Sequence, residues 1–382
     1  MTTHSPDAGP ATGHEQAPEA EDTDRAVAAD VADIERRYRR HTLVRLFALV
    51  TASGLLLVMA VVAMALGTAD IAPGEVVRAV LRLDAAEELN AEAARNAQII
   101  RGLRLPRVVM AILAGASLAV SGTVMQGLLR NVLVSPFTVG ISSAAAFGAS
   151  AAIVLGASVS GTGALAIVST AMTAALCCAG VVFMLSWARQ MRPETVILVG
   201  VALAYLFSAL TATLQFIATD EQIAQIVRWT FGTFNAATWQ EVRVVLAMFV
   251  IGLPLVYAKS GALNALAFGG DDVARGLGVN IVAMRLGCGV LAVGLTAVVI
   301  SFTGVIGFVG LVAPHIARLI IGGDHRYLIP FSVLCGALLL LIADTIGRSL
   351  FAPVLIPVGI VVSYIGVPLF LNLILSRRRA YF

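Results

Sequence analysis

Long apolar runs recur along almost the whole chain, and they constrain its fold more than any other feature. The first run is LVRLFALVTASGLLLVMAVVAMALG, residues 43–67. About 20 apolar residues in a helix are enough to cross the roughly 30 Å hydrocarbon core of a bilayer. Only 13% of the 382 residues are charged and 59% are hydrophobic, whereas soluble domains carry about 25% charged residues. The sequence therefore predicts an all-α polytopic membrane protein and excludes a soluble globular fold.

The apolar runs predict about ten transmembrane spans. They cover residues 43–67, 105–129, 133–156, 162–187, 195–217, 241–259, 283–302, 304–322, 328–350 and 354–376. Glycine and proline interrupt several runs, so nine or eleven spans are alternatives. Short cytoplasmic loops are enriched in Lys and Arg. Because ERRYRR precedes the first run and SRRR follows the last, we expect both termini in the cytoplasm. Among the basic residues that this topology places inside is Arg285.

Residues 1–40 differ from the rest of the chain. They are rich in Pro, Ala, Glu and Asp and contain no apolar run. Such a composition is typical of disordered segments. We therefore expect a disordered cytoplasmic N-terminal tail, with at most a short helix near ADVADIERRYRR, and a transmembrane domain over residues 41–382. The tail lacks the basic start and short apolar core of a secretory signal, so we expect it to stay attached.

The chain carries no motif for ATP hydrolysis. Its single lysine, Lys259, follows Ala258, so the phosphate-binding pattern G-x-x-x-x-G-K-[ST] does not occur. The sequence also lacks H-E-x-x-H, and its four cysteines lie in apolar runs without a C-x-x-C spacing, so we predict no metal site and no cofactor in this chain. These patterns indicate a transport subunit rather than an enzyme.

Asp344 is the only carboxylate clearly inside a predicted span, and Arg348 follows it at position i+4. This spacing lets a helix face form an ion pair. An acidic group inside a membrane can also relay protons in an ion-coupled carrier. We expect a surface ion pair near the outer end of the span rather than a proton relay.

Five motifs, in order along the chain, resemble those of the FecCD family. They are LRLPRVVMAILAGASLAVSGTVMQGLLRN within residues 101–149, GDDVARGLGVN, GVIGFVGLVAPHIARLIIGGDHR, LLLIADTIGR and IPVGIVVSYIGVPLFLNLIL. This family comprises permease subunits of bacterial ABC importers for ferric siderophores, haem and cobalamin. The resemblance runs from about residue 43 to the C-terminus. It implies the type II ABC importer permease fold with ten transmembrane helices per subunit.

The resemblance also implies partners and a location. The permease would pair with a second copy or a paralogue, with two cytoplasmic ATPase subunits that bind ATP and Mg, and with an extracytoplasmic substrate-binding protein. It would be a multi-pass protein of the bacterial inner membrane, with no nucleic-acid partner. We expect an iron–siderophore complex as cargo; haem or cobalamin import is an alternative within the family. An ion-coupled secondary carrier is the alternative from another class.

Three groups of residues match functional positions of the family. The segment 270–279 resembles the helix that couples the permease to the ATPase, through Asp271, Asp272, Ala274, Arg275, Leu277 and Gly278. Arg104, Arg107 and Arg348 match positions that meet glutamates on a binding protein. In the family, the cytoplasmic gate lies at the start of the fifth span, and the third group, Pro193 and Glu194, occupies this position but departs from the small hydroxyl residues of the family's cobalamin importer.

The apolar stretch 303–326 contains Gly304, Gly307 and Gly310 at a spacing of three, followed by Pro314. Small residues let helices approach closely in lipid, where packing drives their association. Proline and glycine are also tolerated there when neighbouring helices satisfy the backbone. We therefore expect close helix packing and a bend or break in this span, with GGDHR forming the turn into the next one.

Overall fold

The computed structural model describes residues 17–67, 71–82, 91–156, 163–350 and 354–375, and all regular structure in these ranges is helical. The helices are α1 (Ala17–Ala65), α2 (Pro73–Leu81), α3 (Ala91–Ile99), a π-helix (Ile100–Arg104), α4 (Leu105–Leu129), a 3-10 helix (Pro136–Val139), α5 (Ile141–Val154), α6 (Gly163–Trp187), α7 (Pro193–Ile217), α8 (Asp220–Thr230), α9 (Trp239–Tyr257), α10 (Ser260–Gly276), α11 (Ile281–Thr303), α12 (Val309–Ile321), α13 (His325–Ser349) and α14 (Val358–Leu375).

The chain divides into two units, residues 1–48 and residues 49–382. In the first unit, residues 17–48 are helical and form most of α1. This differs from the disordered tail expected over residues 1–40, of which only residues 1–16 lie outside the described part. The second unit contains the end of α1 and all the other described elements.

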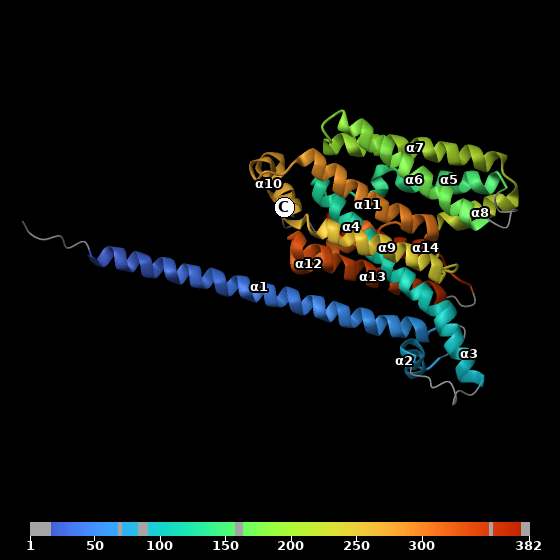
Figure 1. The fold of residues 1–382 in the computed structure, drawn as a ribbon, viewed down its shortest axis with the longest axis horizontal. Helices are drawn as coiled ribbons and strands as arrows, with labels where there is room; N and C mark the ends of the chain where they lie inside the picture. Colours follow the sequence, from blue (N-terminus) through green and yellow to red (C-terminus); the bar gives the residue numbers. More distant parts are fainter. Residues whose placement is uncertain (1–16, 68–70, 83–90, 157–162, 351–353, 376–382) are drawn as a thin grey trace, which may run out of the picture. The chain divides into compact units, whose positions relative to one another are not determined.

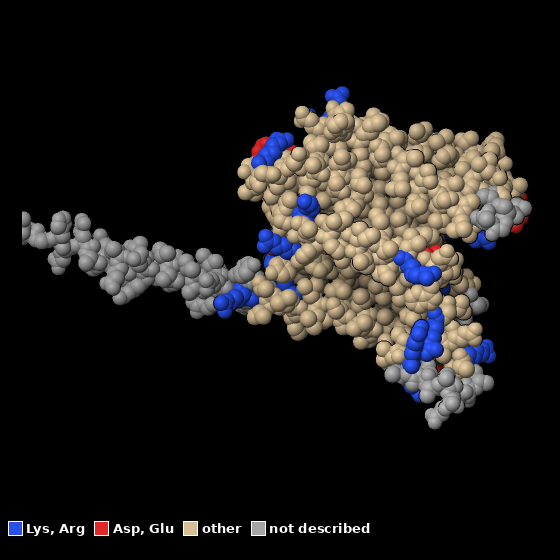
Figure 2. All heavy atoms as spheres, in the orientation of Figure 1, with Lys and Arg blue, Asp and Glu red and all other residues tan. Residues whose placement is uncertain are grey.

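The predicted spans correspond to helices. Among the described residues, seven helices are long and apolar enough to cross a membrane, and three shorter apolar helices, Ile141–Val154, Val309–Ile321 and Val358–Asn372, lie at three further predicted spans. The expectation of an all-α protein with about ten apolar spans is therefore confirmed for the described residues. Figure 2 shows that Lys and Arg gather towards the two ends of the helical body, while the visible surface between them is largely uncharged.

The centre of the second unit is built on α4, α11 and α13. Each spanning helix contains an apolar stretch of 18 residues, which we call its apolar window. In the window of the helix that includes α4, 89% of the residues are buried, and the shares for α11 and α13 are 67% and 56%. The windows of α6, α7 and α9 are only 28%, 17% and 22% buried, so these helices lie at the periphery. In Figure 1, α4 crosses the body from the end that holds α2 and α3 towards the end that holds α10.

The stretch 303–326 breaks where the glycine pattern indicated. Residues 304–308 are not helical, because Gly304 takes a φ of 74° and ends α11, and α12 begins only at Val309. The predicted span 304–322 is therefore shorter than expected. Close packing is confirmed at Gly310, since a side-chain carbon at Gly122 of α4 would overlap its backbone, but Gly307 has open space around it. GGDHR forms the turn into α13, with Asp324 as its N-cap residue.

Candidate functional site

The helix α10 is divided in two by its backbone at Gly270. This glycine has a φ of 75° and a ψ of −174°, which residues with a side chain rarely adopt. A side-chain carbon there would also lie 3.0 Å from a guanidinium nitrogen of Arg130. Residues 271–278 therefore form a short helical turn with its own direction, and we call them the coupling segment. They contain all six residues that match the family's ATPase-coupling helix.

Three of these six residues point away from the protein. The side chain of Asp272 is 98% exposed and that of Arg275 59% exposed, and their ion pair, 3.3 Å between Oδ1 and Nη1, joins successive turns. Leu277 is 69% exposed, beside the 51% exposed Val273. Sequence reasoning missed Val273, although its spacing of four from Leu277 places both on one helix face. The segment thus presents charged and apolar side chains together.

The other three residues attach the segment to the bundle. Ala274 is fully buried. Asp271 accepts from Arg285, with 2.8 Å between Oδ1 and Nη2 and 3.1 Å between Oδ2 and Nη1. Gly278, with a φ of 80°, ends the turn by donating its N–H to the carbonyl of Arg275. Arg285 lies in the first turns of α11 rather than in a loop, and its side chain is only 3% exposed; its placement on the cytoplasmic side stays a prediction.

The first half of α10 is attached to the junction of α12 and α13. The side-chain nitrogen of Asn264 donates to Oδ1 of Asp324 at 2.7 Å. The Oδ1 atom of Asn264 accepts from the backbone N–H of His325 at 2.8 Å, and the ring Nδ1 of His325 lies 2.8 Å from the same oxygen. The sequence indicated only a turn at this position, because Asn264 lies 60 residues before Asp324.

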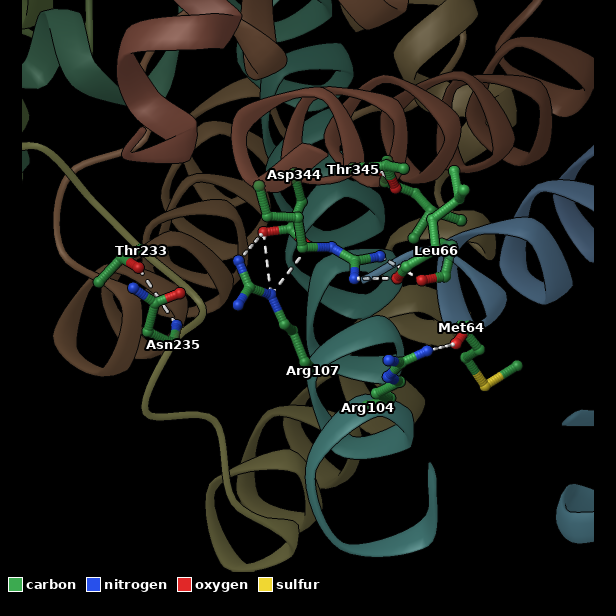
Figure 3. A network of polar contacts seen from close by, with 11 residues as sticks. Met64, Leu66, Arg104, Arg107, Thr233, Asn235, Asp344 and Thr345 are labelled. Atoms are coloured by element: carbon green, nitrogen blue, oxygen red, sulfur yellow. Dashed lines mark hydrogen bonds and ion pairs between the residues drawn. The ribbon is translucent and has the colours of Figure 1, made fainter. Parts of the chain in front are cut away.

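At the opposite end of the bundle, the structure brings Arg107 and Arg348 together around Asp344. Figure 3 shows the side chain of Arg107 pointing towards Asp344. Arg107 donates from Nη2 to Oδ1 of Asp344 at 2.7 Å and from Nε to Oδ2 at 3.0 Å. The Nε of Arg348 lies 3.5 Å from Oδ2. Asp344 is only 2% exposed, so the expected surface pair is wrong: α4 and α13 pack together and enclose the carboxylate.

The arginines Arg104 and Arg348 also hold the end of α1. Nη1 of Arg104 donates to the carbonyl of Met64 at 2.5 Å and to that of Ala65 at 2.9 Å. Arg348 donates to the carbonyls of Ala63 and Leu66. The last four carbonyls of a helix have no partner within it, and cations are favourable near that end. Because α1 has no basic residue in its last turn, other helices supply these cations.

The residues predicted for the gate lie at the start of α7. Pro193 is the first residue of this helix, and Glu194 is exposed in its first turn. An acidic side chain in the first turn of a helix is stabilised by the helix dipole. The geometry therefore explains why this helix begins here, and the gating role of both residues stays a prediction.

A hollow lined by hydroxyl groups opens between α5, α7 and α8. Its volume is about 260 Å³, and its lining residues are Ser142, Ser143, Ala146, Ser208, Thr211, Thr230 and Val305. The Oγ atoms of Ser208 and Ser143 lie 3.5 Å apart. The lining of this hollow contains hydrogen-bonding groups and no ionisable side chain.

Comparison with known proteins identifies the family. The model of the FecCD transport family matches residues 55–376. The hemin transport system permease protein of Yersinia pestis is 39% identical over 279 residues, which are 72% of this chain and 83% of that protein. The Fe(3+)-citrate import system permease protein YfmE of Bacillus subtilis is 35% identical over 334 residues, 87% of this chain and 96% of that protein.

A solved structure shows the same fold. It is described as an inward-facing conformation of a metal-chelate type ABC transporter. Its TM-score is 0.75 at 30% sequence identity, and the alignment covers 86% of this chain and 99% of the other. Because the family model covers the chain from within its first span to its last, the chain belongs to the FecCD transport family and is the permease subunit of an ABC importer.

Proposed function

We propose that this permease moves an iron–siderophore complex from an extracytoplasmic binding protein into the cytoplasm, driven by ATP hydrolysis on separate ATPase subunits. The observation that carries this proposal is the coupling segment. It holds Asp272, Arg275 and Leu277 outward while Ala274 and Asp271 attach it to the bundle. A protruding charged and apolar ridge on a chain without a nucleotide-binding motif suits a protein partner that supplies the energy.

The topology and the partners follow from the same segment. The end of the bundle that holds α10 would face the cytoplasm with both termini, and two ATPase subunits would bind there, one on each copy of a permease dimer. The opposite end would receive the binding protein. Arginine pairs bidentately with carboxylates, so Arg104, Arg107 and Arg348 are the proposed docking residues for acidic side chains. Pro193 and Glu194 would lie at the cytoplasmic gate. The protein would reside in the inner membrane.

The cargo is proposed from the relatives and from the hydroxyl-lined hollow. Relatives are described as permeases of import systems for Fe(3+)-citrate, hemin, cobalamin and molybdate. An iron–siderophore complex is bulky and presents oxygen atoms at its surface. Serine and threonine hydroxyls can hydrogen-bond such atoms without adding a charge. Haem is the second candidate, because the Yersinia pestis relative at 39% identity is a hemin permease.

The coupling role is tested by disrupting the outward face. Arg275→Glu with Leu277→Asp should leave the permease in the membrane and lower ATPase co-purification about 10-fold or more, in the range of interface residues whose loss costs over 1 kcal/mol. A matched control makes the same changes at Arg228 and Leu155, exposed residues at or near α8, and should retain the ATPase. Normal co-purification and normal uptake in the Arg275/Leu277 variant would contradict the coupling role.

The cargo is tested by identifying the small molecule that the partner binding protein retains on purification. The same binding protein, reconstituted with the permease and ATPase, should stimulate vesicle uptake of an iron(III)–siderophore above that of haem or cobalamin. Retention and uptake of haem, with no response to iron(III)–siderophore, would replace the proposed cargo while leaving the permease function intact.

A further inference from the structure

Two polar links tie the halves of α10 to the core of the permease. We propose that Asp271 with Arg285, and Asn264 with Asp324 and His325, are positioning residues that carry movement of the coupling segment into the last turn of α4. The inference rests on the proposed coupling function and specifies how that function reaches the transmembrane helices.

The first link joins three elements through one guanidinium. Arg285 of α11 binds both carboxylate oxygens of Asp271 in the coupling segment, at 2.8 Å and 3.1 Å. Its Nε donates to the carbonyl of Leu128 in the last turn of α4, at 3.2 Å. Bidentate pairs of this kind fix direction as well as distance. A shift of Asp271 therefore acts directly on the position of Arg285 relative to α4.

The second link reaches the same turn of α4 by another route. Asn264 holds Asp324 and His325, and the His325 side chain is only 1% exposed. A side-chain carbon at Gly127 would lie 2.7 Å from Nε2 of His325, so the ring rests against the backbone of α4 at this position. Both links thus end at neighbouring residues, Gly127 and Leu128.

A cavity beside α10 leaves part of the boundary between α10 and α11 without packed side chains, where the polar links can contribute to holding the two helices together. It has a volume of about 470 Å³ and lies between the junction of α9 and α10 and the first turns of α11. Its lining includes Leu255, Lys259, Ala262, Val279, Ala283 and Met284. Where side chains interdigitate, packing holds two helices in place. Side chains do not fill this part of the space between α10 and α11, so the polar links act together with the apolar packing of residues such as Ala274 and Ile281 in setting their relative position.

The helix that receives both links extends across the bundle. The last turn of α4 contains Gly127 and Leu128, and its first turn contains Arg107, which binds Asp344 at the other end. Most of the apolar window of α4 is buried, and a long packed helix transmits displacement along its axis. One element therefore connects the two ends at which the partners are proposed to bind.

The test removes the first link from the complete transporter of permease, ATPase and binding protein in liposomes. Asp271→Asn with Arg285→Gln should retain the ATPase and its hydrolysis, because Asp272, Arg275 and Leu277 are unchanged. Cargo transported per ATP hydrolysed should fall about 10-fold, within the roughly 5–150-fold range of coupling between sites. Asp271→Glu keeps the charge and should restore most of this ratio. Asp220→Asn, an exposed carboxylate on α8, is the control that leaves it unchanged.

A second readout follows the movement itself by hydrogen exchange. ATP should change the exchange of amides in residues 271–276 and also in residues 124–129 of the unmodified transporter. In the Asp271→Asn, Arg285→Gln variant, the response of residues 271–276 should remain and that of residues 124–129 should disappear. If the link were purely structural, the variant would show altered exchange without ATP, and ATP would still change exchange in residues 271–276 and 124–129 together.

The outcomes separate this inference from the function on which it rests. If Arg275→Glu with Leu277→Asp retains the ATPase, the coupling function itself is wrong. If that variant loses the ATPase while Asp271→Asn with Arg285→Gln keeps the normal ratio and the ATP response of α4, only the relay is wrong. If the Asp271→Asn, Arg285→Gln variant does not assemble, Asn264→Ala can be used instead, because it removes the second link without leaving a buried charge unpaired. A normal ratio and a normal α4 response in that variant would overturn the relay.

Discussion

At the scale of single residues, Asp344 shows where sequence reasoning stops. The spacing of four predicts its pairing with Arg348, and the structure confirms that the two charges are close. Arg107 lies 237 positions earlier, and only the packing of α4 against α13 brings it to the same carboxylate. Burial was also unpredictable, because a residue near the end of a span is exposed or enclosed according to its neighbouring helices.

The burial of Asp344 predicts a large loss of stability on its replacement. Asp344→Asn leaves Arg107 and Arg348 without their countercharge, and breaking a buried pair from one side costs about 3–5 kcal/mol. The thermal unfolding midpoint of the purified permease should therefore fall clearly, whereas Asp272→Asn, in a pair that is mostly exposed, should change it little. An Asp344→Asn protein with an unchanged midpoint, normal ATP hydrolysis and no uptake would instead support a proton-carrying role.

The arginines at this end are expected to affect both docking and stability, because they also hold Asp344 and the end of α1. Replacing Arg104, Arg107 and Arg348 together by Ala should weaken binding-protein affinity at least about 10-fold and make the remaining binding less sensitive to salt. Arg104→Ala alone should mainly lower the unfolding midpoint, because its 8% exposed side chain donates to the end of α1. Affinity titrations at low and moderate salt measure the difference. Unchanged affinity of the triple variant would limit these residues to holding α1.

At the scale of elements, apolar length and glycine pattern predicted most of the helices. The runs 105–129, 162–187 and 283–302 agree closely with α4, α6 and α11. Pro73 at the start of α2 is a further local signal, because proline favours the first position of a helix. We missed α8, although Thr219 and Gln222 form a capping box before it. We expected a bend or break in this stretch but not its limits at residues 304–308, because these depend on how Gly304 packs against Trp229 and Gly232.

The contact between α4 and α12 predicts which glycines tolerate a methyl group. Gly122→Ala places a carbon against the backbone of Gly310, and overpacking of this kind costs about 1–3 kcal/mol. Gly180→Ala is the matched control, because Gly180 lies inside α6 with open space around it. Thermal unfolding of both variants is the measurement. Equal midpoints would mean that α4 and α12 are further apart than the structure shows.

At the scale of the whole molecule, the family match favours an ABC importer over an ion-coupled carrier. The arrangement of the described residues agrees with that class. The ridge of Asp272, Arg275 and Leu277 is exposed at one end of the bundle, and Asp344, a carboxylate inside a span, is bound by two arginines at the other.

The most direct test of this account measures the energy source of uptake. Right-side-out or reconstituted vesicles, with the ATPase inside and the cargo-loaded binding protein outside, should accumulate the cargo only when ATP is present on the ATPase side. Accumulation should continue at nearly the same rate after an uncoupler collapses the proton gradient, because no step of the proposed mechanism moves a proton across the membrane. Loss of uptake under the uncoupler, with ATP still supplied and still hydrolysed, would contradict the account.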